Sequence, residues 1–128
     1  MKRFLSSFLL VLIFLSMCSC SHEEHTYTVY LITKSVTSDF WKSVYDGASA
    51  FAGKNKIVVN CLGPNEEKDY REQIIYIEKA IENKADAIIL AAGDYDLMAS
   101  PMEKAVKNKI PVILIDSSVN SDKWLSFI

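Results

Sequence analysis

The stretch that decides the fold is VYLITKSVTSDFWKSVYDGA, residues 29–48. Its first part is rich in Val, Tyr, Ile and Thr and predicts a strand over residues 27–33, and from Ser38 onward apolar and polar residues alternate as they do in a helix. Two aromatic residues, Phe40 and Trp41, therefore lie where a strand passes into a helix. In an open parallel sheet such a crossing faces the crevice that binds ligands, so both rings are candidates for ligand contact.

Phe40 also has a second interpretation. Apolar or small residues recur at helical spacing through the same helix, at Phe40, Val44, Gly47, Ala48 and Phe51. If this stripe is the buried face of the helix, Phe40 begins that face and does not reach a ligand. Trp41 lies off the stripe, so the stripe does not account for it.

The alternation of strand and helix continues along the chain. Further strands are expected at residues 57–62, 85–92, 112–115 and 124–128, and helices at residues 38–54, 66–84 and 94–108. The inward sides of the second and third helices are expected to carry Tyr70, Ile74, Ile77 and Ile81, and Met98, Met102 and Ala105. Near-continuous apolar strands separated by helices predict one α/β domain, an open parallel sheet with helices on both faces.

The N-terminal segment has the features of an export signal. A basic start, Lys2-Arg3, precedes an apolar run that is too short for a membrane-spanning helix, and small residues follow the run. We therefore expect a signal peptide over residues 1–19 and a polar tether over residues 20–26. The folded lobe is expected to occupy residues 27–128.

The signal core runs into Cys18-Ser19-Cys20, and in this respect the segment resembles bacterial lipoproteins, in which a Cys becomes the lipidated first residue. Cys20 follows a small Ser, whereas Cys18 follows the bulky Met17. Cys20 is therefore the expected lipidation site, with Cys18 as the alternative. The resemblance implies an exported, membrane-anchored lipoprotein of the cell envelope.

Composition argues against several classes of protein. The chain carries 14 basic and 16 acidic residues without a basic patch, whereas nucleic-acid binding requires clustered Lys and Arg. Neither the dinucleotide-binding nor the P-loop glycine motif is present. The two His residues, His22 and His25, fall in the expected tether, where we expect them to be solvated and to bind no metal. We expect no cofactor.

No Ser/His/Asp or Cys/His set accompanies the candidate residues, so an enzyme would have to work through carboxylates alone, and we do not expect an enzyme. Cys61 ends an apolar run and is expected to be a partly buried small hydrophobe.

Carboxylates follow two of the later strands. Asp94 follows the third, and Asp116 with Ser117 follows the fourth, which places both acids at the crevice. Asp94 has the alternative role of capping the third helix. Aromatic faces suit the C–H surface of a sugar and carboxylates accept hydrogen bonds from hydroxyls, so the combination suits a hydroxyl-rich small molecule.

Four segments, taken in order, resemble the ribose-type periplasmic binding proteins of sugar transporters: Ser38-Asp39-Phe40-Trp41, Tyr45-Asp46-Gly47-Ala48, residues 85–90 and residues 109–117. The likeness extends from about Tyr27 to Ile128. It implies a two-lobed fold that closes on its ligand about a hinge, of which these residues form part of the N-terminal lobe. Because the sequence stops within the expected fifth strand, we expect it to be a fragment of a longer protein.

The resemblance also implies roles for individual residues. Phe40 and Trp41 would stack on the ligand, and Ser38, Asp94 and Asp116-Ser117 would hydrogen-bond it. Family members often have Pro at the position of Asp39. The implied partners are a small ligand, a carbohydrate above all, and an ABC permease or a membrane sensor kinase.

A different class stays open as the alternative, an exported flavodoxin-like α/β enzyme. A phospho-acceptor domain would need acidic residues after the first strand and an Asp at the end of the third. Thr33-Lys34 and Ala91-Ala92 occupy those places.

Overall fold

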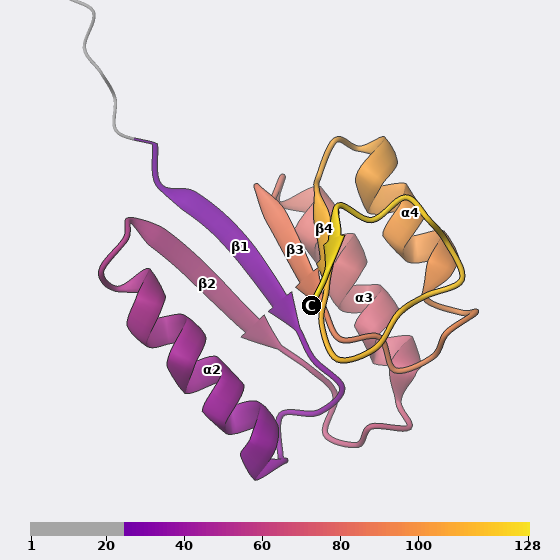
Figure 1. The fold of residues 1–128 in the computed structure, drawn as a ribbon, viewed down its shortest axis with the longest axis horizontal. Helices are drawn as coiled ribbons and strands as arrows, with labels where there is room; N and C mark the ends of the chain where they lie inside the picture. The colour runs from indigo at the N-terminus through magenta and orange to yellow at the C-terminus, as the bar shows by residue number, and fades with distance from the viewer. Residues whose placement is uncertain (1–24) are drawn as a thin grey trace, which may run out of the picture.

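The computed structural model describes residues 25–128, so the expected signal peptide, most of the tether and both candidate lipidation sites lie outside the described residues. Strands and helices alternate through the described part (Figure 1). The elements are β1 (Tyr27–Ile32), α2 (Asp39–Ala52), β2 (Ile57–Leu62), α3 (Tyr70–Glu82), β3 (Ala87–Leu90), α4 (Ala99–Lys107), β4 (Val112–Leu114) and β5 (Ser126–Phe127). None of the helices within residues 25–128 is long and apolar enough to cross a bilayer.

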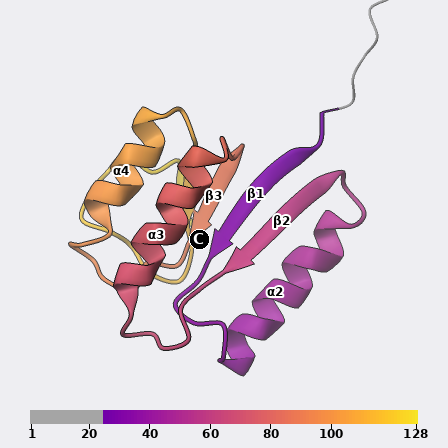
Figure 2. The ribbon, with the colours of Figure 1, turned by 180° about the vertical axis from the view of Figure 1, so that it is seen from behind.

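The strands form one parallel sheet in the order β2-β1-β3-β4-β5. The chain moves from β1 to β2 in one direction and then crosses β1 to reach β3 in the other, so right-handed crossovers put α2 on one face and α3 and α4 on the opposite face. Figure 2 shows α3 and α4 side by side in front of the sheet, with α2 along β2. The predicted fold class, an open parallel sheet with helices on both faces, is confirmed.

The main core lies between the sheet and the pair α3 and α4. Ile32, Ile88 and Leu90 from the strands are fully buried against residues of the two helices. The predicted inward side of α3 is confirmed, with Ile77 buried and its three apolar companions partly buried beside it. The predicted inward side of the third helix is also confirmed, since Met98, Met102 and Ala105 are fully buried, with Met98 directly before the first residue of α4.

The buried face of α2 differs from the predicted stripe. Phe40 and Phe51 are 61% and 62% exposed, whereas Trp41 and Ala52 are buried, so the interpretation in which Phe40 begins the buried face is wrong. The two buried residues each lie one position later than the two exposed rings, and Tyr45 anchors α2 to the edge strand β2. The Tyr45 hydroxyl donates to the Leu62 carbonyl oxygen at 2.9 Å.

Two helices begin later than predicted. α3 begins at Tyr70 instead of residue 66, after a turn in which the Asp69 N–H donates to the Glu66 carbonyl oxygen at 3.0 Å. α4 begins at Ala99 instead of residue 94, because residues 94–98 form a separate turn. Pro101 fits the first turn of α4, where backbone N–H groups have no partner within the helix.

Each of the connections from α2, α3 and α4 to the next strand contains an Asn-Lys pair with the lysine in the left-handed region. The φ angles are 50° at Lys56, 52° at Lys84 and 65° at Lys109. These three connections lie together at the amino edge of the sheet, opposite the edge to which the strand arrowheads point in Figure 1.

Candidate ligand-binding site

The order of the strands reverses between β1 and β3, and a side chain from α3 joins the carboxyl ends of these two strands. Gln73 is fully buried, and its Nε2 donates to the carbonyl oxygens of Thr33 at 2.7 Å and Ala91 at 2.9 Å. Its Oε1 accepts from the Gly93 N–H at 2.8 Å. One side-chain amide therefore satisfies three backbone groups at the point where open α/β sheets bind ligands.

The contact between the Gly93 N–H and the Gln73 Oε1 explains why position 93 is a glycine. A Cβ at that position would lie 2.9 Å from the Gln73 Oε1 and 3.2 Å from the Tyr70 Cβ. Glycine therefore lets the chain after β3 approach the amide closely.

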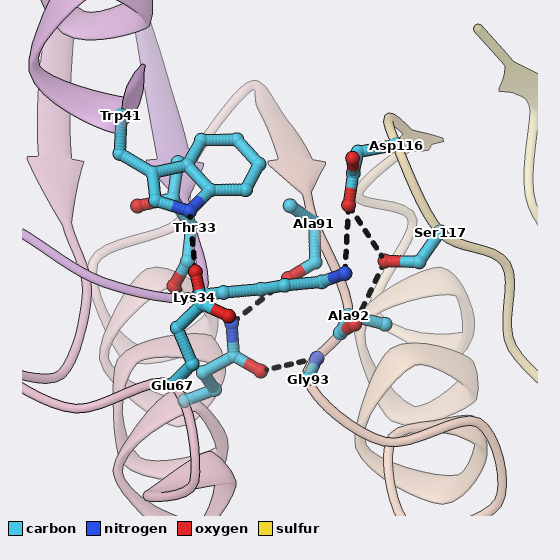
Figure 3. Close-up of polar contacts among 10 residues, drawn as sticks. Thr33, Lys34, Trp41, Glu67, Ala91, Ala92, Gly93, Asp116 and Ser117 are labelled. Atoms are coloured by element: carbon cyan, nitrogen blue, oxygen red, sulfur yellow. Dashed lines mark hydrogen bonds and ion pairs between the residues drawn. The ribbon is translucent and has the colours of Figure 1, made fainter. Parts of the chain in front are cut away.

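Two predicted site residues, Asp116 and Ser117, lie at the carboxyl edge of the sheet, the side on which the parallel strands end (Figure 3). The Asp116 Oδ2 is 2.7 Å from the Lys34 Nζ, which joins the chain after β4 to the chain after β1. The Ser117 hydroxyl donates to the Ala92 carbonyl oxygen at 2.8 Å, which joins it to the chain after β3. Asp116 adopts a φ of 63°, and its N–H donates to the Ile128 carbonyl oxygen at 3.2 Å.

The predicted aromatic pair divides into one buried and one exposed ring. Trp41 is 3% exposed, and its Nε1 donates to the Glu67 Oε1 at 3.4 Å, which ties α2 to the connection before α3 (Figure 3). Phe40 meets it edge to face, with ring centroids 4.8 Å apart and planes at 75°. Of the two rings, that of Phe40 is exposed, and it contacts the buried indole of Trp41.

Ser38 occupies the position before α2, with extended backbone angles, but its side chain makes no capping hydrogen bond. The preceding residue, Thr37, also does not cap the helix, because its hydroxyl donates to the Asn65 carbonyl oxygen at 2.8 Å. The Ser38 hydroxyl is partly exposed at the start of the helix, beside the aromatic pair.

Asp94 performs a local structural role. Its Oδ1 accepts from the N–H groups of Asp96 at 2.9 Å and Leu97 at 2.8 Å. The carboxylate therefore caps the turn before α4 and not the helix itself, whose first residue is Ala99. One carboxylate oxygen is engaged in this way, and the side chain is partly exposed.

The contacts of Lys34, Asp116 and Ser117 thus join the segments that follow β1, β3 and β4, whereas Asp94 is held within its own turn.

Two residues at this edge of the sheet, Lys34 and Gln73, were not predicted from the sequence. Gln73 leaves a signal in the sequence, a polar residue within the apolar stripe of α3. Lys34 is the first charged residue after β1, but nothing in the sequence pairs it with Asp116.

The remaining predictions concern metal and thiol chemistry. Within residues 25–128 no three His, Cys, Asp or Glu side chains gather as metal ligands. His25 is 63% exposed but is not simply solvated, because its Nε2 lies 3.0 Å from the Asp86 Oδ1 and its ring meets Tyr27 edge to face. Cys61 is half-buried as predicted, and burial raises the pKa of its thiol, which disfavours the reactive thiolate.

The fold, with polar side chains at the carboxyl ends of its strands, places the chain in a class of proteins. These are the doubly wound α/β proteins, which carry polar groups at the topological switch point. Comparison with known proteins narrows the class. The profile of the periplasmic binding protein domain matches residues 29–128, and the chain belongs to this family.

Two characterised relatives are similar in sequence. The D-ribose/D-allose-binding protein of Pseudomonas aeruginosa is 30% identical over 129 residues, which cover 91% of this chain and 40% of that protein. The D-apiose import binding protein of Actinobacillus succinogenes is 32% identical over 92 residues, which cover 72% of this chain and 29% of that protein.

Two solved structures of solute-binding proteins are also similar to this chain. A carbohydrate transporter solute-binding protein from Agrobacterium radiobacter, in complex with D-arabinose, superposes with a TM-score of 0.77 at 30% identity, over 82% of this chain and 35% of that one. A solute-binding protein from Agrobacterium vitis with bound D-fucose gives 0.74 at 36% identity, over 78% and 36% of the two chains. The chain thus spans about 40% of the length of the first of the two relatives.

Proposed function

We propose that these residues form part of the N-terminal lobe of an exported solute-binding protein that captures a small hydroxylated ligand, a sugar, and delivers it to an ABC importer. The relatives named above bind D-ribose, D-allose or D-apiose, or contain D-arabinose or D-fucose. The protein has no catalytic role in this proposal, and it acts outside the cytoplasm.

The proposal rests on one observation, the meeting of three polar side chains at the switch point between β1 and β3. A carboxylate, an ammonium group and a hydroxyl from Asp116, Lys34 and Ser117 meet on an edge that also bears the exposed ring of Phe40. Hydroxyl groups of a sugar need both donors and acceptors, and its C–H face suits an aromatic ring. Ser38 would add a further hydroxyl from the start of α2.

A second lobe, of the kind that the family resemblance implies, would close over this edge and complete the site. Closure would explain how a shallow edge achieves affinity, since pockets that hold small ligands bury most of the ligand surface. Asp94 would then contact the ligand through the oxygen that its turn does not use.

The proposal predicts that sugar binding changes the fluorescence of Trp41 in the two-lobed protein. D-Ribose, D-allose, D-arabinose and D-fucose serve as probes, and Trp41→Phe should abolish the signal. Trp124→Phe is the matched control, because Trp124 donates its Nε1 to Ser121 in the connection before β5. The control variant should keep the signal. If none of the four sugars binds, as judged also by calorimetry, the proposed function is wrong.

We also propose that the protein is anchored to the membrane by lipid on Cys20, on the strength of the lipoprotein-like signal in the sequence. Cys20→Ala should move the protein from the membrane fraction to the soluble fraction. Retention at the membrane would point to Cys18 instead.

A further inference from the structure

The amino edge of the sheet, on the opposite side from the proposed sugar site, gathers positive charge. The three connections that meet there (residues 53–56, 83–86 and 108–111) contain one carboxylate and four exposed lysines, which are Lys54, Lys56, Lys84 and Lys109. The connection that leads into β5 ends at the same edge and adds one acid and one base, Asp122 and Lys123. The amino edge is therefore a positively charged surface.

Three of the four lysines are not neutralised by the described part of the chain. Within residues 25–128, Lys54, Lys84 and Lys109 form no ion pair, whereas four lysines elsewhere each pair with a carboxylate. Exposed and uncompensated ammonium groups attract anions.

A groove brings two of these lysines together. It opens between the ends of α3 and α4 with a volume of about 410 Å³, and Lys84 and Lys109 both line it. Its apolar lining includes Ile81 and Ile110, and Glu82 is the one carboxylate that lines it. Lysines beside apolar side chains match the boundary of a membrane, where lipid headgroups lie above the acyl chains.

The chain enters the lobe within this surface. The Tyr27 N–H, at the start of β1, donates to the Lys56 carbonyl oxygen at 3.2 Å. Two residues earlier, the His25 Nε2 lies 3.0 Å from the Asp86 Oδ1. The start of the described chain is thus attached to the connections that follow α2 and α3, among the lysines of the amino edge (Figure 1).

The proposed lipid on Cys20 would hold this surface near the membrane. Six residues, 21–26, separate Cys20 from β1, and they reach at most about 20 Å when fully extended. A tether this short raises the effective concentration of the lysines at the lipid surface. The length argument rests on the proposed lipid anchor, whereas the charge of the edge and the entry point of the chain do not.

We propose that the amino edge is a membrane-contact surface, on which the exposed lysines around the start of β1 bind the headgroups of anionic phospholipids. This contact orients the lobe. Because β1 has six residues, the carboxyl edge lies about 20 Å further from the bilayer, and the proposed sugar site faces away from the lipid. An electrostatic contact of this kind is reversible and weakens with salt, so it does not prevent later docking on an importer.

The test measures partitioning onto phospholipid vesicles by cosedimentation. The two-lobed protein is produced without residues 1–20, so that neither lipid nor the signal segment contributes. Vesicles of pure phosphatidylcholine are compared with vesicles that contain about 30% phosphatidylglycerol. At about 0.05 M salt the protein should partition about thirtyfold or more in favour of the anionic vesicles, and at about 0.5 M salt the preference should be lost.

Lys84→Asn combined with Lys109→Asn removes the two lysines of the groove, and Asn tolerates the φ angles of 52° and 65° at these positions. This double variant should lower partitioning onto the anionic vesicles by about tenfold or more, because each lysine near an anionic surface contributes about fivefold. The matched control is Lys42→Gln combined with Lys68→Gln, which removes the same charge from exposed positions near the carboxyl edge. It should lower partitioning by less than about threefold.

The alternative role of these lysines is local, since a basic residue near the end of a helix stabilises the helix dipole. Urea denaturation of both double variants separates the two roles. If the groove variant loses stability but keeps its preference for anionic vesicles, the lysines are only structural and the inference is wrong. It is also wrong if the unaltered protein shows no such preference, or if both double variants lose it equally. None of these outcomes depends on a bound sugar, so the inference and the proposed function fail separately.

Discussion

The Gln73 side chain joins the carboxyl ends of β1 and β3, in addition to the backbone hydrogen bond from the Ala91 N–H to the Ile32 carbonyl oxygen. Its amide satisfies the Thr33 and Ala91 carbonyl oxygens and the Gly93 N–H, all at a fully buried position. A buried backbone group that loses its partner costs about 1–3 kcal/mol. The amide is therefore a structural contact at the switch point where the ligand is proposed to bind.

Replacing Gln73 by Met keeps the length of the side chain but removes all three hydrogen bonds. We expect the free energy of unfolding to fall by about 3–5 kcal/mol, as measured by urea denaturation, because two buried carbonyl oxygens and one partly buried N–H lose their partner. Arg71→Met, on the exposed side of the same helix, should change it by less than about 0.5 kcal/mol. A loss below about 1 kcal/mol for Gln73→Met would contradict this role of the amide.

Asp86 is the residue from which we expect a pH dependence. The Thr28 N–H donates to its Oδ2 at 2.7 Å, and His25 contacts its other oxygen. The Thr28 N–H first, and His25 second, hold the pKa of this carboxyl below its usual value of 3.8. The ionised form is therefore favoured in the folded protein more than in the unfolded chain.

The stabilisation from Asp86 should be complete above pH 3.8 and disappear as the pH falls through the lower pKa of the folded state. Asp86→Asn should therefore reduce the free energy of unfolding near neutral pH, and the difference from the unaltered protein should shrink in acid. Denaturation curves across this range measure the difference. A difference that is constant with pH would show that the carboxylate charge contributes nothing.

At the scale of the elements, the order of strands and helices could be predicted because apolar runs and helical periodicity are local properties of the sequence. The inward sides of α3 and α4 were predicted correctly, since each helix packs on several buried strands and carries a wide apolar stripe. For α2 the sequence left two interpretations of Phe40 open, burial and ligand contact, and the structure buries Trp41 instead of Phe40. This helix packs on an edge strand and exposes two Phe residues, so its hydrophobic pattern does not mark its contact face.

The candidate site was predictable only in part, for a related reason. Residues that follow strands could be found from the sequence, but the contacts among them join segments far apart in the chain. The pairing of Lys34 with Asp116 depends on strand order, which places the ends of β1 and β4 on either side of β3. Trp41 is likewise buried with a partner that is distant in sequence, because its Nε1 donates to the Glu67 Oε1.

The turn before α4 should depend on the hydrogen bonds that the Asp94 side chain accepts. Asp94→Ala removes the acceptor for two backbone N–H groups and should lower the free energy of unfolding by about 1 kcal/mol, whereas Asp94→Asn keeps an acceptor oxygen and should be close to neutral. Urea denaturation compares the two variants. Equal losses for Ala and Asn would mean that the charge, and not the hydrogen bonds, maintains the turn.

At the scale of the whole molecule, the described lobe has chemically distinct ends. The connections at the carboxyl edge of the sheet (residues 33–38, 63–69, 91–98 and 115–118) carry six carboxylates and two lysines, and those at the amino edge (residues 53–56, 83–86 and 108–111) carry four lysines and one carboxylate. The first residues of β1 emerge at the amino edge, so in our proposal the tether to the membrane and the sugar attach at opposite ends of the lobe. A second lobe is expected to meet the carboxyl edge.

The central claim is that a sugar binds at the carboxyl edge of this lobe, and amide chemical shifts in the two-lobed protein test it most directly. On titration with D-ribose, D-allose, D-arabinose and D-fucose, at least one sugar should shift the amide signals of Lys34, Phe40, Gly93 and Asp116. The signals of residues 83–86 and 108–111 at the amino edge should stay in place. Shifts confined to the amino edge, or no shifts with any of the four sugars, would contradict the account.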